Sequence, residues 1–196
     1  MQRSIAIIGT AGRDKRFPMD QSHWEFMCRV AGFFLRPGDH IVSGGAAWAD
    51  HVAIWAYNNG LCAGLTLHLP APFETTFNGG SGTSGGTANH YHRQFGRTIN
   101  RDTFLDIQDA LQGGAQFTEQ PESKGYAAMF ARNKLVADQC THMLAFTFGT
   151  GDVPADGGTK ATWDMAGPQK KRKHVSLLGL EQRCRTSVGY RNKCDS

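Results

Sequence analysis

The sequence predicts an α/β fold in which helices cover both faces of a mostly parallel sheet. Short apolar runs alternate with longer segments of helical periodicity, and this alternation is typical of βαβ units. Three of the apolar runs end in glycines, in the stretches IIGTAGRD, IVSGGAAWAD and FTFGTGDVPADGGT. The chain has 196 residues, of which 40% are hydrophobic and 19% charged, so it is long enough for one domain with a sizeable core.

Five strands and four helices are expected in this order. The strands are apolar runs bounded by glycine or proline, within SIAIIGTAG, IVSGG, CAGLTLHLP, HMLAFTF and HVSLLGL. The first helix, at 21–35, has an apolar stripe and is ended by RPGDH. The second, within 47–60, has alanines and a valine at helical spacing and stops at Asn59-Gly60. Residues 125–139 have the same periodicity, and a last helix begins over 157–166.

Residues 72–121 interrupt the alternation and are expected to form an insertion. Two glycine-rich patches accompany the block NHYHRQFGRTINRD, which is rich in aromatic and basic side chains, among them His92 and Arg93. Because long insertions in an α/β core are often functional, we expect a lid that stacks on a base and adds charge over a ligand. A surface helix with an oligomer contact is the alternative. The HxH pair has no third ligand nearby, so no metal site is expected.

The charge distribution and the cysteine content indicate which binding partners and which cellular compartment to expect. Residues 170–196 hold eight Lys or Arg and two acids, a charge of +6, whereas the remainder holds 13 basic and 15 acidic residues, a charge of −2. We therefore divide the chain into one domain, 1–180, and a basic tail, 181–196, which is either a nucleic-acid contact or a solvated face. Five dispersed cysteines indicate reduced thiols in the cytoplasm. No apolar run approaches a membrane span, so no membrane partner is expected.

The three glycine-rich strand ends predict a site for a phosphate or a nucleotide. The carboxyl ends of parallel strands meet at one edge of the sheet, and glycine lets the backbone approach a ligand closely. Helix N-termini that follow such loops present free N–H groups to anions. The stretches match neither GxGxxG nor GxxxxGK[ST]. The candidate ligand-binding residues of the loops are Gly9, Thr10, Gly12, Arg13, Gly44, Gly45, Asp50, Gly157, Gly158, Thr159 and Thr162.

Four segments in order resemble the SLOG superfamily. They are IAIIGTAG, IVSGGAAWAD with HVAIWA, ARNKLVADQCTHMLAF and DGGTKATWD, and they span residues 4–166. The superfamily includes the Lonely Guy phosphoribohydrolases, the DNA-processing A proteins and molybdenum-cofactor carrier-like proteins. The resemblance implies a Rossmann-like fold and a nucleotide-derived ligand.

The phosphoribohydrolase branch suggests an activity and two catalytic residues. Its arginine-bearing helix matches Arg132, with Asn133 beside it, and its PGGxGTxxE loop matches 156–164. Asp164 then stands where that branch has a catalytic glutamate, although Lys160-Ala161 replaces Gly-Thr. The resemblance implies an N-glycosidase-like hydrolase that releases free base from a nucleoside 5′-monophosphate. Arg132 would hold the phosphate, and Asp164 would stabilise the oxocarbenium-like centre and position water.

Two other functions fit the same residues. Many superfamily relatives bind, sense or carry nucleotides or pterins without turnover. The differences between the third loop and the PGGxGTxxE motif suit such a protein. A DNA-binding protein of the DNA-processing A type would use the basic stretch QKKRKH. In all three cases we expect a phosphorylated ligand, no separate cofactor and a homo-oligomer.

Overall fold

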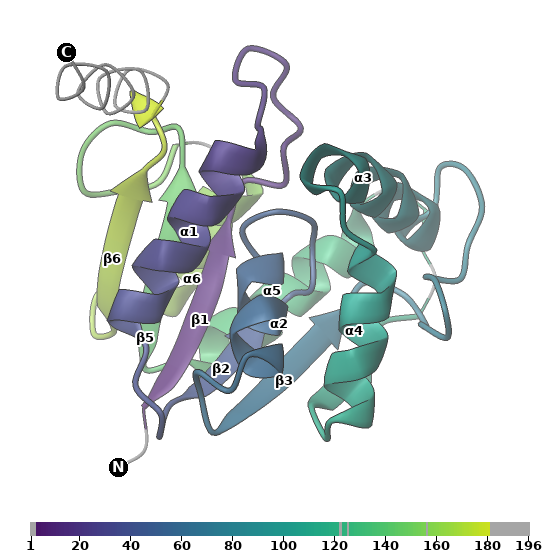
Figure 1. Cartoon of the computed structure of the whole chain (residues 1–196), viewed down its shortest axis with the longest axis horizontal. Helices are drawn as coiled ribbons and strands as arrows, with labels where there is room; N and C mark the ends of the chain where they lie inside the picture. The colour runs from purple at the N-terminus through teal and green to yellow at the C-terminus, as the bar shows by residue number, and fades with distance from the viewer. Residues whose placement is uncertain (1–2, 122, 125, 156, 181–196) are drawn as a thin grey trace, which may run out of the picture.

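The computed structural model describes residues 3–121, 123–124, 126–155 and 157–180. These form a six-stranded sheet in the order β4-β3-β2-β1-β5-β6 (Figure 1), and every pairing between neighbours is parallel. The elements are β1 Ser4–Gly9, α1 Gln21–Phe34, β2 His40–Ser43, α2 His51–Asn58, β3 Gly64–Leu69, α3 Ser84–Ile99, α4 Thr103–Gln112, β4 Gln116–Glu119, α5 Ala127–Gln139, β5 His142–Thr147, α6 Gly158–Ala166 and β6 Lys171–Ser176. The Rossmann-like α/β architecture is confirmed.

The strand order reverses next to β1. The chain starts in the middle of the sheet, builds outward through β2, β3 and β4, and then returns to the other side of β1 with β5 and β6. In open α/β sheets, such a switch point leaves a crevice outside the carboxyl ends of the two central strands. A ligand site is therefore expected at the loops that follow β1 and β5.

The sheet divides the core into two layers, with helices on both faces. Ile5 and Ile7 of β1 pack into the larger cluster with α1, α2, α3 and α4. Ala6 and Ile8, which alternate with them, pack into a smaller cluster that contains Val136 of α5 and residues of α6. Figure 1 places α1, α2 and α4 in front of the sheet and α5 and α6 behind it. None of the helices in the described residues is long and apolar enough to cross a membrane.

The segment 72–121 is more closely integrated with the core than the sequence predicts. It carries α3, α4 and β4, and β4 pairs with β3 at the edge of the sheet. Phe95 of α3 and Ile107 of α4 are fully buried in the larger cluster. The segment thus supplies a sixth strand and two packed helices, because its apolar residues face inward between polar ones.

The last strand also differs from the prediction. It runs over Lys171–Ser176, so it begins three residues before the predicted stretch HVSLLGL, and Leu177 and Leu180 are buried beyond its end. The basic stretch QKKRKH is therefore largely an edge strand. The predicted tail, 181–196, lies outside the described residues.

Candidate functional site

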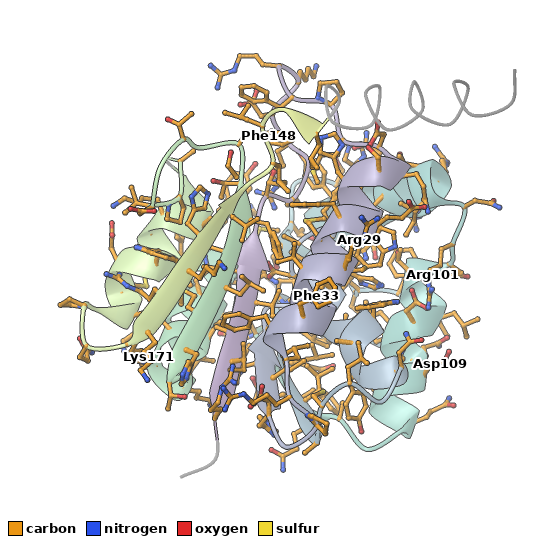
Figure 2. The ribbon with its side chains drawn as sticks, turned by 60° about the vertical axis from the view of Figure 1, so that its left-hand side comes forward. Arg29, Phe33, Arg101, Asp109, Phe148 and Lys171 are labelled. Carbon is orange, nitrogen blue, oxygen red and sulfur yellow. The ribbon has the colours of Figure 1, made fainter. Side chains whose placement is uncertain are left out.

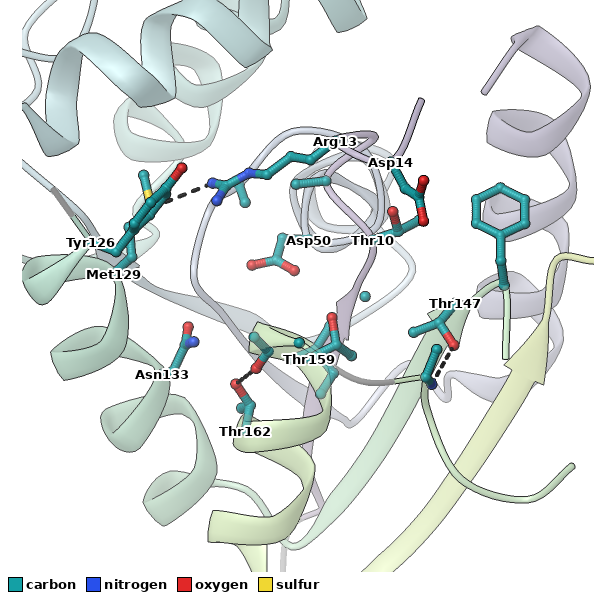
Figure 3. Close-up of a pocket in the computed structure, with 18 of the residues that line it drawn as sticks. Thr10, Arg13, Asp14, Asp50, Tyr126, Met129, Asn133, Thr147, Thr159 and Thr162 are labelled. Atoms are coloured by element: carbon teal, nitrogen blue, oxygen red, sulfur yellow. Dashed lines mark hydrogen bonds between the residues drawn. The ribbon is translucent and has the colours of Figure 1, made fainter. Parts of the chain in front are cut away.

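A cavity of about 650 Å³ opens at the switch point between β1 and β5 (Figure 3). Its floor and walls come from the loops after β1 and β5, from the loop between β2 and α2, from α5 and from the N-terminus of α6. The lining residues include Gly9, Thr10, Arg13, Asp50, Arg132, Asn133, Gly157, Gly158, Thr159 and Thr162. Ten of the residues predicted from the sequence are thus brought together, although they come from four separate segments of the chain.

The N-terminus of α6 presents unused backbone donors to this cavity. Its N-cap, Gly157, has φ of 124° and no side-chain cap bond among the described residues. The first N–H groups of a helix have no partner within the helix, and the helix dipole makes this end attractive to anions. The hydroxyl of Thr162 donates to the carbonyl of Gly158 at 2.9 Å, so this side chain does not occupy the N–H groups of the first turn.

A buried arginine forms the second cationic element of the site. Arg132, on α5, is 6% exposed, and its Nη1 donates to the carbonyl of Gly44. Its Nε has no hydrogen-bond partner among the described residues, although it is buried. Burial lowers the pKa of Arg132, and the charge of Asp50 opposes that shift. An arginine keeps its charge under such a shift, so the cavity contains a guanidinium with unused hydrogen-bonding capacity.

Asp50 supplies a carboxylate to the back of the cavity. It is 8% exposed and lies at the start of α2 without capping that helix. Burial raises the pKa of Asp50, whereas the charge of Arg132 and the backbone N–H groups of Ala46 and Gly9 act in the opposite direction. In Figure 3 the carboxylate faces the space between Arg13 and Thr159.

Aromatic side chains line two sides of the mouth. On the α5 side, Tyr126 and Phe130 are 51% and 50% exposed, one helical turn apart. Arg13 lies against the Tyr126 ring with its Cζ 5.3 Å from the centroid, and its Nη2 is 3.4 Å from Met129 Sδ (Figure 3). On the opposite side, Phe17 and Phe148 stack with centroids 4.8 Å apart and an angle of 10° between their planes.

Thr147 organises the loop after β5, which sequence reasoning missed. Its hydroxyl oxygen accepts from the backbone N–H groups of Gly149 and Ala155, both at 3.1 Å, and is 2.8 Å from His174 Nε2. These bonds fold the loop back on itself so that Ala155 lines the cavity beside Thr147. One sequence signal could have indicated this role of Thr147: it is the last residue of a strand that leads into a glycine-rich loop.

Several predicted site residues lie elsewhere. Gly44 and Gly45 form the backbone behind the cavity, and a Cβ at Gly12 would lie 2.5 Å from Trp48 Nε1, so that glycine is required by packing. Arg93 is exposed on α3, with its Cζ 6.0 Å from the centroid of the Phe104 ring. Contrary to the expected lid contact, His92 is 1% exposed within the core.

Asp164 does not line the cavity. Its side chain is 57% exposed and is paired with Lys160, with Oδ2 2.6 Å from Nζ. Successive helical residues are separated by about 100°, so Asp164 lies about 200° around α6 from Thr162, which does line the cavity. The buried carboxylate that lines this cavity is Asp50, from a different element, whereas Asp14, which also lines it, is paired with Arg16.

Comparisons with known proteins place the chain in a family. No family model matches it. In solved structures, it resembles DNA processing protein A from Helicobacter pylori, which was studied for its single-stranded DNA binding mode, with 17% identity, a TM-score of 0.46 and coverage of 96% of this chain and 81% of that chain. It is 30% identical over 187 residues to uncharacterized protein R261 of Acanthamoeba polyphaga mimivirus, which covers 90% of this chain and 94% of that protein. The chain therefore belongs to the same protein family as protein R261 of that virus.

Proposed function

We propose that the protein binds a nucleotide or another phosphorylated small molecule in the switch-point cavity, with the phosphate at the N-terminus of α6. The observation that carries the proposal is the convergence of this helix end with Arg132, a buried guanidinium; among the described residues, no side chain caps the helix and the Nε of Arg132 has no partner. Helix N-termini and guanidinium groups are the two common protein partners of phosphate oxygens. The resemblance of the three glycine loops to the SLOG superfamily supports the same conclusion.

The rest of the cavity suits the non-phosphate part of a nucleotide. Tyr126 and Phe130 offer half-exposed ring surface on which a base can stack, as apolar and aromatic walls do in most small-molecule sites. Asn133, which lines the same wall, offers both donors and an acceptor for the edge of a base. Asp50 can accept hydrogen bonds from sugar hydroxyls, while the Gly157–Thr159 backbone holds the phosphate.

A base-releasing hydrolase is the second candidate, and Asp50 is the observation that favours it. Cleavage of an N-glycosidic bond develops positive charge on the sugar, which a nearby carboxylate stabilises while it positions water. The resemblance assigned this role to Asp164, but that carboxylate is paired with Lys160 away from the cavity. We therefore assign the role, in this second candidate, to Asp50.

Calorimetry with nucleoside 5′-monophosphates and their parent nucleosides tests the proposal. We expect at least one monophosphate to bind and its nucleoside to bind much more weakly. Arg132→Ala should weaken binding by about 2–5 kcal/mol, as truncation of one partner of a buried charge pair does. Arg29→Ala is the matched control, because Arg29 is exposed on α1 (Figure 2) and is not among the residues that line the cavity. A folded protein that binds no phosphorylated member of the panel would remove the proposal.

A further inference from the structure

Two consecutive residues of α3, Tyr91 and His92, reach toward the two arginines of the cavity, yet neither lines the main cavity. The Cζ of Arg13 lies 4.7 Å from the centroid of the Tyr91 ring and 5.3 Å from that of the Tyr126 ring. A guanidinium within about 6 Å of an aromatic face is attracted to it electrostatically. Arg13 is therefore held at the mouth by rings from two different segments, one of which is α3.

His92 holds the backbone loop behind the cavity. Its Nε2 donates to the carbonyl of Gly45 at 3.0 Å, and its Nδ1 lies 3.2 Å from the hydroxyl of Thr103. Burial lowers the pKa of His92 to about 3, so the imidazole is neutral at physiological pH. In that form one ring nitrogen carries a proton, and the carbonyl at Gly45 requires the donor to be Nε2.

The bond from His92 leads through one peptide unit to Arg132. Gly44 and Gly45 are consecutive, and the carbonyl of Gly44 accepts from Nη1 of Arg132 while that of Gly45 accepts from His92. The two bonds together fix the orientation of this short glycine segment, which otherwise has wide conformational freedom. The side chains that line a void of only about 10 Å³ here include those of the two arginines, Arg13 and Arg132, of the two α3 residues, Tyr91 and His92, and of Met129. Little room is therefore left for these side chains to shift.

We propose that α3 is a positioning element for the anion site, in which Tyr91 holds Arg13 and His92 holds, through the Gly44–Gly45 segment, the position of Arg132. This rests on the proposed phosphate-binding function and extends it to residues that do not contact the ligand. A cationic side chain that is fixed before binding loses less conformational entropy when the ligand arrives, so both residues raise the affinity for phosphate. The segment predicted as a lid acts from behind and beside the cavity instead.

The Tyr91 contact is tested by a double-mutant cycle. The probe is the 5′-monophosphate that binds the wild-type protein most tightly, measured by calorimetry. We expect Tyr91→Leu to weaken its binding about three- to tenfold, whereas Tyr91→Phe, which keeps the ring, stays within about twofold. In an Arg13→Ala background, Tyr91→Leu should have no further effect. Equal losses in both backgrounds would show that Tyr91 acts through general packing and would overturn this part of the inference.

The His92 contact is tested by replacing the donor and then restoring it. His92→Phe keeps a ring but leaves the Gly45 carbonyl without its donor, and we expect binding about tenfold weaker. His92→Gln places an N–H near the position of Nε2 and should recover most of the affinity. Thermal unfolding of both variants measures the loss of stability, which is expected for either. The loss of affinity should occur only in His92→Phe, which lacks the N–H donor.

The outcomes separate this inference from the proposed function. If the wild-type protein binds no monophosphate, the proposed function fails. If it binds one and Tyr91→Leu and His92→Phe bind it equally well, only the positioning role is overturned. Should His92→Phe not fold, the Tyr91 variants decide alone, because that side chain is only partly buried.

Discussion

The carboxylate of Asp50 and the guanidinium of Arg132 converge on Gly44, directly after β2. A Cβ added to Gly44 would lie 2.9 Å from Asp50 Oδ2 and 3.0 Å from Arg132 Cζ. Both distances are shorter than normal contacts, so a side chain at this position would displace one charged group or the other. The glycine therefore allows a buried acid and a buried base to share one end of the cavity.

Gly44→Ala should impair ligand binding more than it impairs folding. The added methyl group meets charged atoms that belong to the site, and we expect the affinity for a phosphorylated ligand to fall at least about tenfold. Overpacking of this kind costs about 1–3 kcal/mol of stability. Calorimetry and urea unfolding of the same preparation measure the two effects separately.

Gly32→Ala is the control for this substitution. Gly32 lies within α1, and a Cβ there would meet no atom within 4 Å. Because alanine is the better helix former, this variant should be slightly more stable and bind as the wild type does. Equal ligand affinity in Gly44→Ala and in the wild type would show that the convergence at Gly44 has no bearing on binding.

His92 should make the protein less stable as the pH falls. Its pKa is lowered from 6.5 to about 3 in the folded state, so below pH 6.5 the unfolded chain takes up a proton that the folded chain does not. Its contribution to stability is complete above pH 6.5 and is lost progressively as the pH falls toward 3. Between pH 6.5 and 5 this loss amounts to about 1.5 kcal/mol.

Urea unfolding of the wild type and of His92→Gln at several pH values measures this contribution. The difference in unfolding free energy between the two proteins should shrink as the pH is lowered, because glutamine does not titrate. Burial also lowers the pKa of His51, so the variant should retain part of the acid sensitivity. Parallel curves for the two proteins from pH 7 to 5 would contradict a neutral, buried His92.

Much of the fold follows from local sequence patterns. Buried strands such as β1 and β5 are continuous apolar runs, and α1 has both a clear apolar stripe and a break at RPGDH. The edge strands lack those signals. β4 has only four residues, QFTE, all exposed, and β6 begins with a basic run that is typical of a solvated surface. Edge strands are defined by their pairing with a neighbour, which a single sequence does not display.

The candidate site was predictable where glycines and strand ends define it. Thr10, Thr159 and Arg132 were expected at one crevice, and they line one cavity. Asp164 was assigned by its place in a motif, and a motif gives the position along α6 but not the side of the helix that faces the ligand. His92 shows the converse, because it was expected in a lid over the ligand and is instead buried, with its Nε2 bonded to the carbonyl of Gly45.

The basic residues of β6 should contribute to polyanion binding but not to small-ligand binding. Arg172 donates to the carbonyl of Trp163 at 2.8 Å, whereas Lys171 and Lys173 are exposed at the edge of the sheet. We expect the double variant Lys171→Glu/Lys173→Glu to bind the monophosphate within about twofold of the wild type. Each lost phosphate contact should reduce the slope of log affinity against log salt for duplex DNA by about 0.9. A full-length protein without salt-dependent DNA binding would remove the nucleic-acid alternative.

Asp50→Asn and Asp164→Asn form a matched pair that separates a hydrolase from a binding protein. The two substitutions make the same chemical change, one inside the cavity and one on the outer side of α6, where Asp164 is paired with Lys160. If the protein releases base from a monophosphate, Asp50→Asn should slow release by about 10²–10⁴-fold, whereas Asp164→Asn should leave it within about twofold. Release is followed by chromatography of the free base, and binding by calorimetry. Slower release by Asp164→Asn alone would restore the assignment made from the motif. A wild-type protein that binds the monophosphate tightly and releases no base is a binding protein, in which Asp50 serves the sugar hydroxyls alone.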